Sequence, residues 1–570
     1  MRITETADLW YKNAVVYCID LETYLDSDGD GVGDLHGLTQ RIDYLAEIGV
    51  NCLWLMPFYP SPRRDNGYDI EDFYGVDSRY GNHGDFVELI RLAHDRGIRV
   101  IVDLVINHTS DRHPWFRKSR TSTQNPYRDY YVWRADDPGD TSDQTMFPDS
   151  EDGIWTYDEK TGEWYLHHFL HTQPDLNTGN PAVRDEIAKI MGFWLQVGVD
   201  GFRVDAVPFA INQSTFEGKD EHDLDEPHDY LRALRAFLQR RSSGHGSAIM
   251  LGEVNLPHEE QLSFFGGEDG DQLTMQFDFF TNQRLFLALA RQDAGPLADA
   301  LTNRPQNLAM ETQHANFLRN HDELTLDLLS EEERQEVLDT FAPEEEHRFA
   351  GRGIRRRLPG MFEGDPRRLK MAYSLLFSLP GTPVLFYGEE IGMGENLKVP
   401  GREAVRTPMQ WANAKNGGFS AAKPSQLSRA VAEGPYGPEH INAAEARREQ
   451  DSLLHHVTRL AKRYRESPEI GWGSFEVIEQ PHRCVMAHRV TWEDRSMVLL
   501  HNLGSEPVTV PFELKDEEAG AELVDLLDEA SCALDGDHAT EITLEAMATA
   551  GCGSGARATR GCSEHGREAA

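Results

Sequence analysis

The chain has 570 residues, 39% of them hydrophobic, so it can bury a large core and is too long for one simple domain. Its 56 basic and 96 acidic side chains give a formal net charge of −40. A surface of this sign repels nucleic acid and anionic lipid. We therefore expect neither nucleic acid nor a membrane as a partner.

The amino-terminal segment MRITETADLW lacks a basic stretch followed by an apolar core, and no run of about 18 apolar residues occurs in the chain. The six cysteines show neither paired nor metal-like spacing. These features predict a cytoplasmic protein without a disulfide framework. They leave open whether it forms an oligomer.

Eight short apolar runs alternate with longer amphipathic stretches, and the runs begin at residues 15, 50, 98, 200, 248, 273, 314 and 382. Their continuous apolar character is typical of strands buried on both faces of a parallel sheet. Eight strand–helix alternations favour a closed barrel over an open sheet. The sequence thus predicts an α/β fold, a (β/α)₈ TIM barrel built from residues 1–107 and 178–473.

Three further segments interrupt or follow the barrel. Residues 108–177 are rich in Asp, Pro, Tyr and Trp and too long for a plain loop, which predicts a subdomain inserted after the third strand. Residues 474–550 contain short strand-like runs separated by turn residues, which predicts a C-terminal all-β domain, a β-sandwich. Residues 551–570 lack apolar content and are predicted to form a disordered tail.

Acidic side chains end three of the predicted strands, where the reactive residues of such barrels gather. They are Asp205 in GFRVDAVPF, Glu253 in LGEVN and Asp322 in FLRNHDE, accompanied by His108, Arg203 and His321. Each carboxylate alone has an alternative explanation as the N-cap of the next helix. Three in one ring, with an arginine and two histidines beside them, favour a catalytic site.

Two carboxylates on neighbouring strands suit the cleavage of a glycosidic bond. Strands lie about 4.8 Å apart, and carboxylates about 5–5.5 Å apart support the retaining route through a covalent intermediate. Arg203 lies two residues before Asp205 on the same side of the strand, so its charge would keep Asp205 ionised. Glu253 must instead be protonated, which requires a less polar or more anionic setting.

An acidic, glycine-rich loop, DSDGDGVGD, spans residues 26–34. Its potential oxygen ligands alternate along the chain and are Asp26, Asp28, Asp30, the carbonyl of Val32, and Asp34. This spacing is typical of a calcium loop, and the glycines permit a tight turn. The alternative is an acidic turn without a metal, because the loop lacks the twelfth-position Glu and the preceding helix of an EF-hand.

Several motifs resemble those of a known family. DLVINHTS, GFRVDAVPF, GEVN and FLRNHDE resemble, in order, the four signature regions of the α-amylase superfamily of glycoside hydrolases, and QPDLN resembles a fifth region of its oligo-1,6-glucosidase-like branch. The resemblance implies that the substrate is a small α-linked disaccharide or oligosaccharide. It also implies that Asp205 is the nucleophile, Glu253 the general acid/base, and Asp322 the carboxylate that stabilises the transition state.

The resemblance assigns binding residues as well. It implies that His108 and His321 hydrogen-bond the bound glucosyl ring and that Tyr68 stacks on this ring; the alternative for Tyr68 is a tyrosine of the core. It implies that Asp65 pairs with Arg406 to close the pocket floor, the alternative being a surface ion pair.

The resemblance implies a metal but no organic cofactor. Calcium, or magnesium in its place, would bind the acidic loop of residues 26–34 with a structural role. Asn107 and Asp175 match two ligands of a second calcium between the barrel and the insertion, although the remaining ligands find no match in this sequence.

Within the superfamily, GDGVGDLHGL, FLRNHDELTL, GIRRRL and VRTPMQW most resemble the trehalose synthase branch, whose members interconvert maltose and trehalose. Departures beside the acid/base, at Gly252 and from Val254 to Pro257, leave the choice of acceptor open. The charged stretch of residues 329–358 either covers the site or is a solvated helical excursion. The alternatives are an exo-acting α-glucosidase or another α-glucosyltransferase, and a non-catalytic relative that would have lost the carboxylates retained here.

Overall fold

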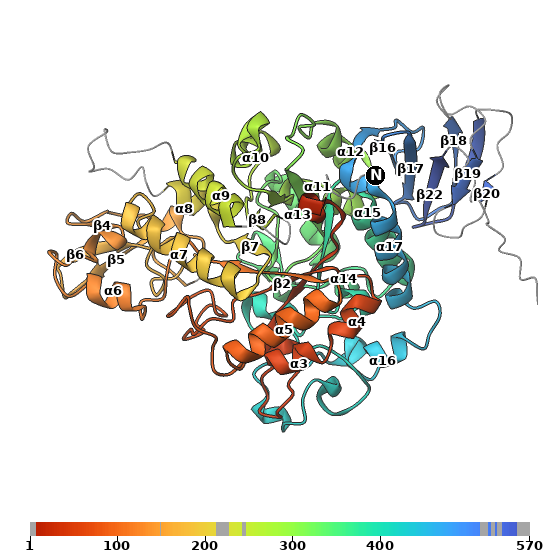
Figure 1. Ribbon diagram of the computed structural model, residues 1–570. Helices are drawn as coiled ribbons and strands as arrows, with labels where there is room; N and C mark the ends of the chain where they lie inside the picture. The colour runs from red at the N-terminus through yellow and green to blue at the C-terminus, as the bar shows by residue number, and fades with distance from the viewer. Residues whose placement is uncertain are drawn as a thin grey trace, which may run out of the picture.

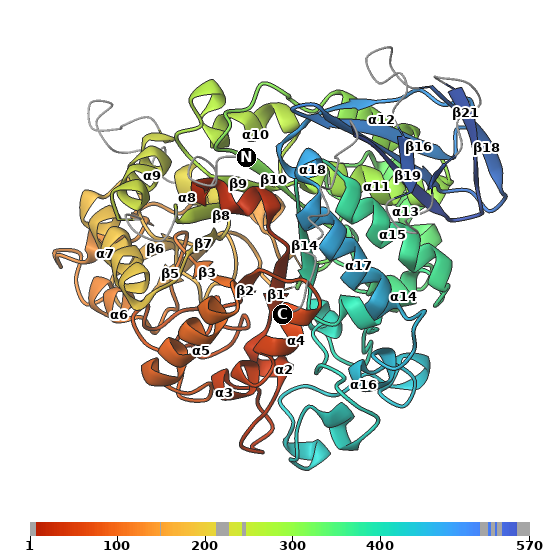
Figure 2. The same cartoon turned by 45° about the vertical axis from the view of Figure 1, so that its right-hand side comes forward.

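The computed structural model describes residues 7–148, 150–212, 227–241, 247–513, 522–525, 531–532 and 539–555. Its centre is a closed barrel of parallel strands in the order β1-β14-β10-β9-β8-β7-β3-β2, ringed by helices (Figures 1 and 2). This confirms the predicted (β/α)₈ barrel, and each of the eight predicted runs overlaps one of its strands. The strands are β1 (Val16–Ile19), β2 (Cys52–Leu55), β3 (Arg99–Leu104), β7 (Gly201–Val204), β8 (Ile249–Gly252), β9 (Met275–Phe277), β10 (Gln313–Phe317) and β14 (Thr382–Phe386).

The helices outside the barrel bury one face and follow ordinary capping rules. For example, Asn82 and Asp85 form a capping box at the start of α5 (His83–Asp95), and Asn180 caps α7 (Pro181–Val197), whose C-cap is Gly198 with φ 120°. None of the described helices is long and apolar enough to cross a bilayer. They include α3 (Leu35–Thr39), α4 (Ile42–Glu47), α5 (His83–Asp95), α7 (Pro181–Val197), α8 (Val207–Asn212), α9 (Asp229–Arg241), α10 (His258–Phe265), α11 (Phe279–Arg291), α12 (Gly295–Thr302), α13 (Glu331–Phe341), α15 (Pro366–Ser378) and α17 (Leu453–Glu466).

The chain between β3 and α7 projects from one side of the barrel (Figure 1). It contains α6 (Pro114–Ser119) and an antiparallel sheet in the order β4 (Trp133–Arg134), β6 (Glu163–Leu166), β5 (Trp155–Asp158). Aromatic rings of α6 and this sheet pack together; Phe116 stacks on Trp133 at 5.7 Å between ring centroids. An isolated bridge between His108 and Asp175 returns the insertion to the barrel rim.

The C-terminal segment forms two sheets on the side opposite the insertion (Figure 2). The larger sheet has the order β15 (Ser474–Val477), β16 (Val485–Trp492), β17 (Arg495–Asn502), β22 (Thr549–Gly555), β19 (Glu522–Asp525), β20 (Ser531–Cys532), and the smaller pairs β18 (Val508–Glu513) with β21 (Ala539–Leu544). Successive side chains along β17 point to opposite faces of the larger sheet, and both faces are packed. Val498 and Leu500 join a small core with Val510, whereas Met497 and Leu499 belong to the core of the barrel.

The predicted disordered tail of residues 551–570 is wrong in its first part. Strand β22 continues to Gly555 and pairs with β17, for example Gly553 with Met497. The glycine-rich composition concealed this strand, because its stability comes from backbone pairing with neighbours on both sides and not from apolar side chains of its own. Residues 556–570 lie outside the described part of the chain.

Candidate active site

The first two predicted carboxylates follow neighbouring strands in matched register. Val204 of β7 is the partner of Gly252 in β8, so Asp205 and Glu253 leave the barrel side by side. The amide of Glu253 donates to the carbonyl of Val204 at 3.0 Å. The amide of Ala206 donates to Oε2 of Glu253 at 3.1 Å, from a residue with φ 47°. This left-handed backbone, unusual for a residue with a side chain, turns the chain sharply behind Asp205.

A buried arginine joins the carboxylates. Arg203 is 2% exposed, and its guanidinium contacts Asp205, Glu253 at 2.8 Å and Asp103 at 2.8 Å. Asp103 also accepts a hydrogen bond from Trp54 Nε1 at 2.7 Å. Asp103 opens the DLVINHTS motif and was not among the predicted site residues, although an acidic residue within an apolar strand was a usable signal. Its position fixes the orientation of Arg203 between the two site carboxylates.

The electrostatic setting separates the two carboxyls. Burial raises the pKa of Glu253 to about 7; Arg203 opposes this shift, while the negative charges of Asp205 and Asp322 add to it. Burial likewise raises the pKa of Asp205 to about 6, against the opposing charge of Arg203. Of the two carboxyls, Glu253 therefore keeps its proton to higher pH, and Asp205 ionises first.

The third carboxylate lies across the ring. Asp322 is held by Arg402 at 2.8 Å, by Arg406 at 2.7 Å and by His321 at 3.1 Å. Burial opposes its ionisation, but these partners outweigh burial and hold its pKa well below the usual value. His321 also bonds to the hydroxyl of Tyr68 at 2.9 Å and stacks on that ring. Burial lowers the pKa of His321 to about 4, so it is neutral near pH 7.

The predicted pairing of Asp65 with Arg406 is wrong. Asp65 pairs with Arg402 at 2.7 Å, while Arg406 binds Asp322 and the carbonyl of His321. Both arginines belong to one short turn, since Arg402 lies in the 3₁₀ helix η8 (Gly401–Val405) and Arg406 directly follows it. The VRTPMQW motif identified the turn correctly. The contacts of the two arginines, however, depend on how this turn packs against residues 65 and 322, and the spacing of residues in the sequence does not define that packing. Arg402 thus bridges the pocket floor and the third carboxylate.

A pocket of about 340 Å³ opens in front of these groups. Glu253, Asp322 and Arg402 form its polar side, and Phe147, Phe169, Phe209 and Phe279 contribute aromatic walls. Its volume is at the lower end of the range for small-molecule sites. Asn255 and Leu256 also line it, so the sequence departures beside Glu253 do face the site.

The stretch of residues 329–358 divides into an outer helix and an inner strand. Helix α13 packs on the outside, where Glu333 pairs with Arg284 of α11 at 2.9 Å. Strand β13 (Gly353–Ile354) returns towards the site, pairing with β11 (Leu324–Thr325) and β12 (Arg348–Phe349). Arg352 lines the pocket and donates to the carbonyl of Met146 in the insertion at 2.8 Å. The pocket is therefore walled jointly by the insertion and by this excursion.

The remaining predicted binding residues adjoin the pocket floor. His108 is 1% exposed and bonds to Gln173 at 3.1 Å, and Gln173 donates to Asp65 at 3.0 Å. Gln173 opens the QPDLN motif but was not among the predicted site residues. The side-chain amide of Asn107 donates to Asp175 at 3.1 Å, so the two residues predicted for a second metal site lie side by side.

The contacts around Asp175 do not favour a metal. Its carboxylate pairs with His168 and accepts from the amide of Asn107. An imidazole and an amide satisfy this carboxylate without an ion.

The acidic loop gathers three of its four aspartates. Carboxylate oxygens of Asp26, Asp28 and Asp34 all lie within 4.8 Å of one another, a group that does not include Asp30. The exposed carboxylate of Asp30 accepts from the amide of Val32 at 2.8 Å. The pKa of Asp28 is raised, first by partial burial and then by the neighbouring acidic groups. Oxygen ligands in a tight loop with mutual repulsion are suited to a hard divalent cation.

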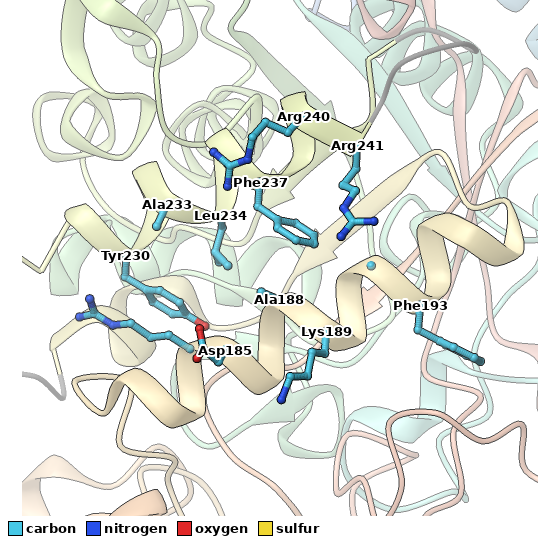
Figure 3. A pocket seen from close by; sticks show the side chains of 12 residues that line it. Asp185, Ala188, Lys189, Phe193, Tyr230, Ala233, Leu234, Phe237, Arg240 and Arg241 are labelled. Atoms are coloured by element: carbon cyan, nitrogen blue, oxygen red, sulfur yellow. The ribbon is translucent and has the colours of Figure 1, made fainter.

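A larger hollow, of about 730 Å³, lies between α7 and α9 on the outside of the barrel (Figure 3). Phe237 and Tyr230 of α9 face the helix α7 across it, with basic side chains such as Lys189 and Arg241 at its edge. None of the predicted site residues lines this hollow. The chemistry therefore belongs to the smaller pocket at the strand ends.

Comparison with known proteins agrees with this geometry. The family described as "Alpha amylase, catalytic domain" matches residues 20–340 and 355–473. A trehalose synthase/amylase of Mycobacterium tuberculosis is 39% identical, covering 89% of this chain and 84% of its own. An oligo-1,6-glucosidase of Bacillus cereus is 30% identical, covering 90% of this chain and 94% of its own.

Among solved structures, the isomaltulose synthase SmuA from Protaminobacter rubrum superimposes with a TM-score of 0.76 at 25% identity. The match covers 96% of this chain and 99% of that one. The barrel, the catalytic-domain match over most of the chain and the ring of three carboxylates lead to one conclusion: the chain belongs to the α-amylase family.

Proposed function

We propose that the protein is a retaining α-glucosyl-transferring enzyme of the trehalose synthase type, which interconverts maltose and trehalose through a covalent glucosyl–Asp205 intermediate. The observation that carries this proposal is the pairing of Asp205 and Glu253 on neighbouring strands with pKa values of about 6 and 7. The relatives named trehalose synthase support the choice of sugars.

In the first step, Glu253 gives its proton to the glycosidic oxygen while a carboxylate oxygen of Asp205 attacks the anomeric carbon. The C–O bond to the leaving glucose breaks, and a glucosyl ester forms with inverted configuration. Asp322, ionised by its arginine partners, lies where it can stabilise positive charge on the ring.

In the second step, Glu253 removes a proton from an acceptor hydroxyl, which attacks the same carbon and releases Asp205. The second inversion restores the α configuration. When the acceptor is the anomeric hydroxyl of the retained glucose, the product is trehalose; when it is water, the product is glucose. The two outcomes differ only in the acceptor.

The closed end of the pocket supports an exo mode. Asp65, Arg402 and Gln173 form a hydrogen-bonded floor, and we expect this floor to admit a terminal glucosyl unit but no continuing chain. The aromatic walls and the Arg352–Met146 contact limit access of water to the acceptor side. An exo-acting α-glucosidase, or another α-glucosyltransferase on short α-glucosides, is the alternative, which the oligo-1,6-glucosidase relative favours.

We also propose one structural divalent cation, calcium with magnesium as the alternative, held by Asp26, Asp28 and Asp34. Bound there, it would neutralise three converging carboxylates and stabilise the loop. Ser420 donates to Asp26 in the same place and ties the loop to a distant segment.

We expect a bell-shaped pH dependence of kcat/KM for maltose. Activity falls below about pH 6, as the carboxylate of Asp205 takes up a proton, and above about pH 7, as Glu253 loses its proton.

In Glu253→Gln the turnover of maltose falls by about 10²–10⁴-fold. Turnover of α-glucosyl fluoride, whose leaving group needs little protonation, falls far less; equal losses on both substrates would argue against an acid role.

With maltose as sole substrate, we expect trehalose as a principal product and glucose as a by-product, followed by NMR at early times. The released glucose must stay in the pocket, so added labelled glucose enters trehalose only slowly. Glucose as the only product would identify a hydrolase, and mainly trisaccharides would identify an open transferase site.

Calcium should raise the melting temperature of the metal-free protein, because it binds only the folded loop. Asp28→Asn should abolish this rise. Asp30→Asn is the matched control and should retain it, since Asp30 lies outside the cluster. An unchanged melting temperature at millimolar calcium would remove the metal proposal.

A further inference from the structure

An arginine outside the pocket, whose side chain is mostly covered, contacts the residues next to both partners of the floor ion pair. Arg429 follows the 3₁₀ helix η10 (Pro424–Gln426), and its side chain is 11% exposed. One end of the guanidinium pairs with Glu403, and the other donates to the side-chain oxygen of Asn66. Glu22 lies 3.9 Å away as a further counter-charge. Arg429 thus connects three segments that are distant in the sequence.

The two groups that Arg429 binds are the immediate neighbours of the floor residues. Asn66 follows Asp65, and Glu403 follows Arg402. Asn66 has φ 51°, a left-handed conformation that asparagine tolerates better than most residues, and its side chain is committed to Arg429. The Arg429 guanidinium therefore binds the residue next to each partner of the Asp65–Arg402 ion pair.

The segment that carries Arg429 is fixed by a backbone hydrogen bond of the preceding residue. The amide of Ser428 donates to the carbonyl of Gly31 at 3.0 Å, which fixes this segment on the acidic loop. Glu22 also pairs with Arg63, so it keeps a cationic partner if Arg429 is removed. Glu403 is 34% exposed and can be hydrated. Loss of Arg429 should therefore loosen the floor without leaving a deeply buried unpaired charge.

We infer that Arg429 is a positioning residue, which sets substrate affinity by holding Asp65 and Arg402 in register while touching no substrate itself. This inference rests on the proposed function, because it assumes that the Asp65–Arg402 floor grips the terminal glucosyl unit. The physical basis is that a misplacement of positioning groups by about 1 Å, caused by a change away from the reacting atoms, can cost about a hundredfold in activity.

The test compares Arg429→Met, which keeps most of the side-chain length, with Arg429→Lys and with the control Arg367→Met. Arg367 forms an exposed pair with Asp365 away from the site. With 4-nitrophenyl α-glucoside, Arg429→Met should raise KM roughly tenfold to a hundredfold with a smaller change in kcat. Arg429→Lys should recover part of the affinity, and the control should match the wild type.

A double-mutant cycle with Asp65→Asn separates positioning from general stability. If Arg429 acts through the floor, Arg429→Met adds little to KM once Asp65 has been changed. Should Arg429→Met fold poorly, Glu403→Gln weakens the same contact from the other side and should raise KM in the same way. A fall in melting temperature with unchanged KM, or fully additive effects on KM, would overturn the inference.

Failure of the proposed function gives a different result. In that case the wild-type enzyme itself shows no turnover of 4-nitrophenyl α-glucoside, maltose or trehalose. A wild type that turns over α-glucosides, with an Arg429→Met variant of equal KM, overturns only the role of Arg429.

Discussion

The active site depends on one buried cation. Arg203 is almost fully enclosed by the barrel and touches Asp103, Asp205 and Glu253. Without the positive charge of Arg203, burial would disfavour ionisation of all three carboxyl groups. With this charge, some of the three carboxyl groups can be ionised while another keeps its proton. Arg203 and Asp205 lie two residues apart along one strand, and Glu253 follows the next strand. The register of the barrel therefore places one positive charge beside both carboxyl groups.

A second set of arginines serves the opposite half of the ring. Arg402 and Arg406 keep Asp322 ionised, and Arg402 also completes the floor with Asp65. The site therefore holds one carboxyl that retains its proton near neutrality and one that stays ionised, with Asp205 between them. This graded arrangement suits a reaction in which acid, nucleophile and electrostatic stabiliser must differ although all are carboxyl groups.

The sequence predicts the barrel well because most of the eight strands lie in short, mainly apolar runs, and their order places Asp205, Glu253 and Asp322 at one end. It fails where the outcome depends on packing between distant segments. The choice of Arg402 over Arg406 as partner of Asp65 and the contribution of Arg429 through Asn66 and Glu403 have no periodic signal. Strand β22 is missed for a related reason, since its glycines carry no apolar pattern and only pairing with β17 and β19 defines it.

The central claim is that Asp205 forms a covalent bond to the sugar. Trapping with 5-fluoro-α-glucosyl fluoride, followed by proteolysis and mass spectrometry, tests this directly, because the fluorine slows breakdown of the ester more than its formation. We expect one equivalent of fluoroglucosyl label on the peptide that contains Asp205 and none in Asp205→Asn. Label on the peptide that contains Glu253, or turnover of the reagent to a β-configured product without any labelled protein, would contradict it.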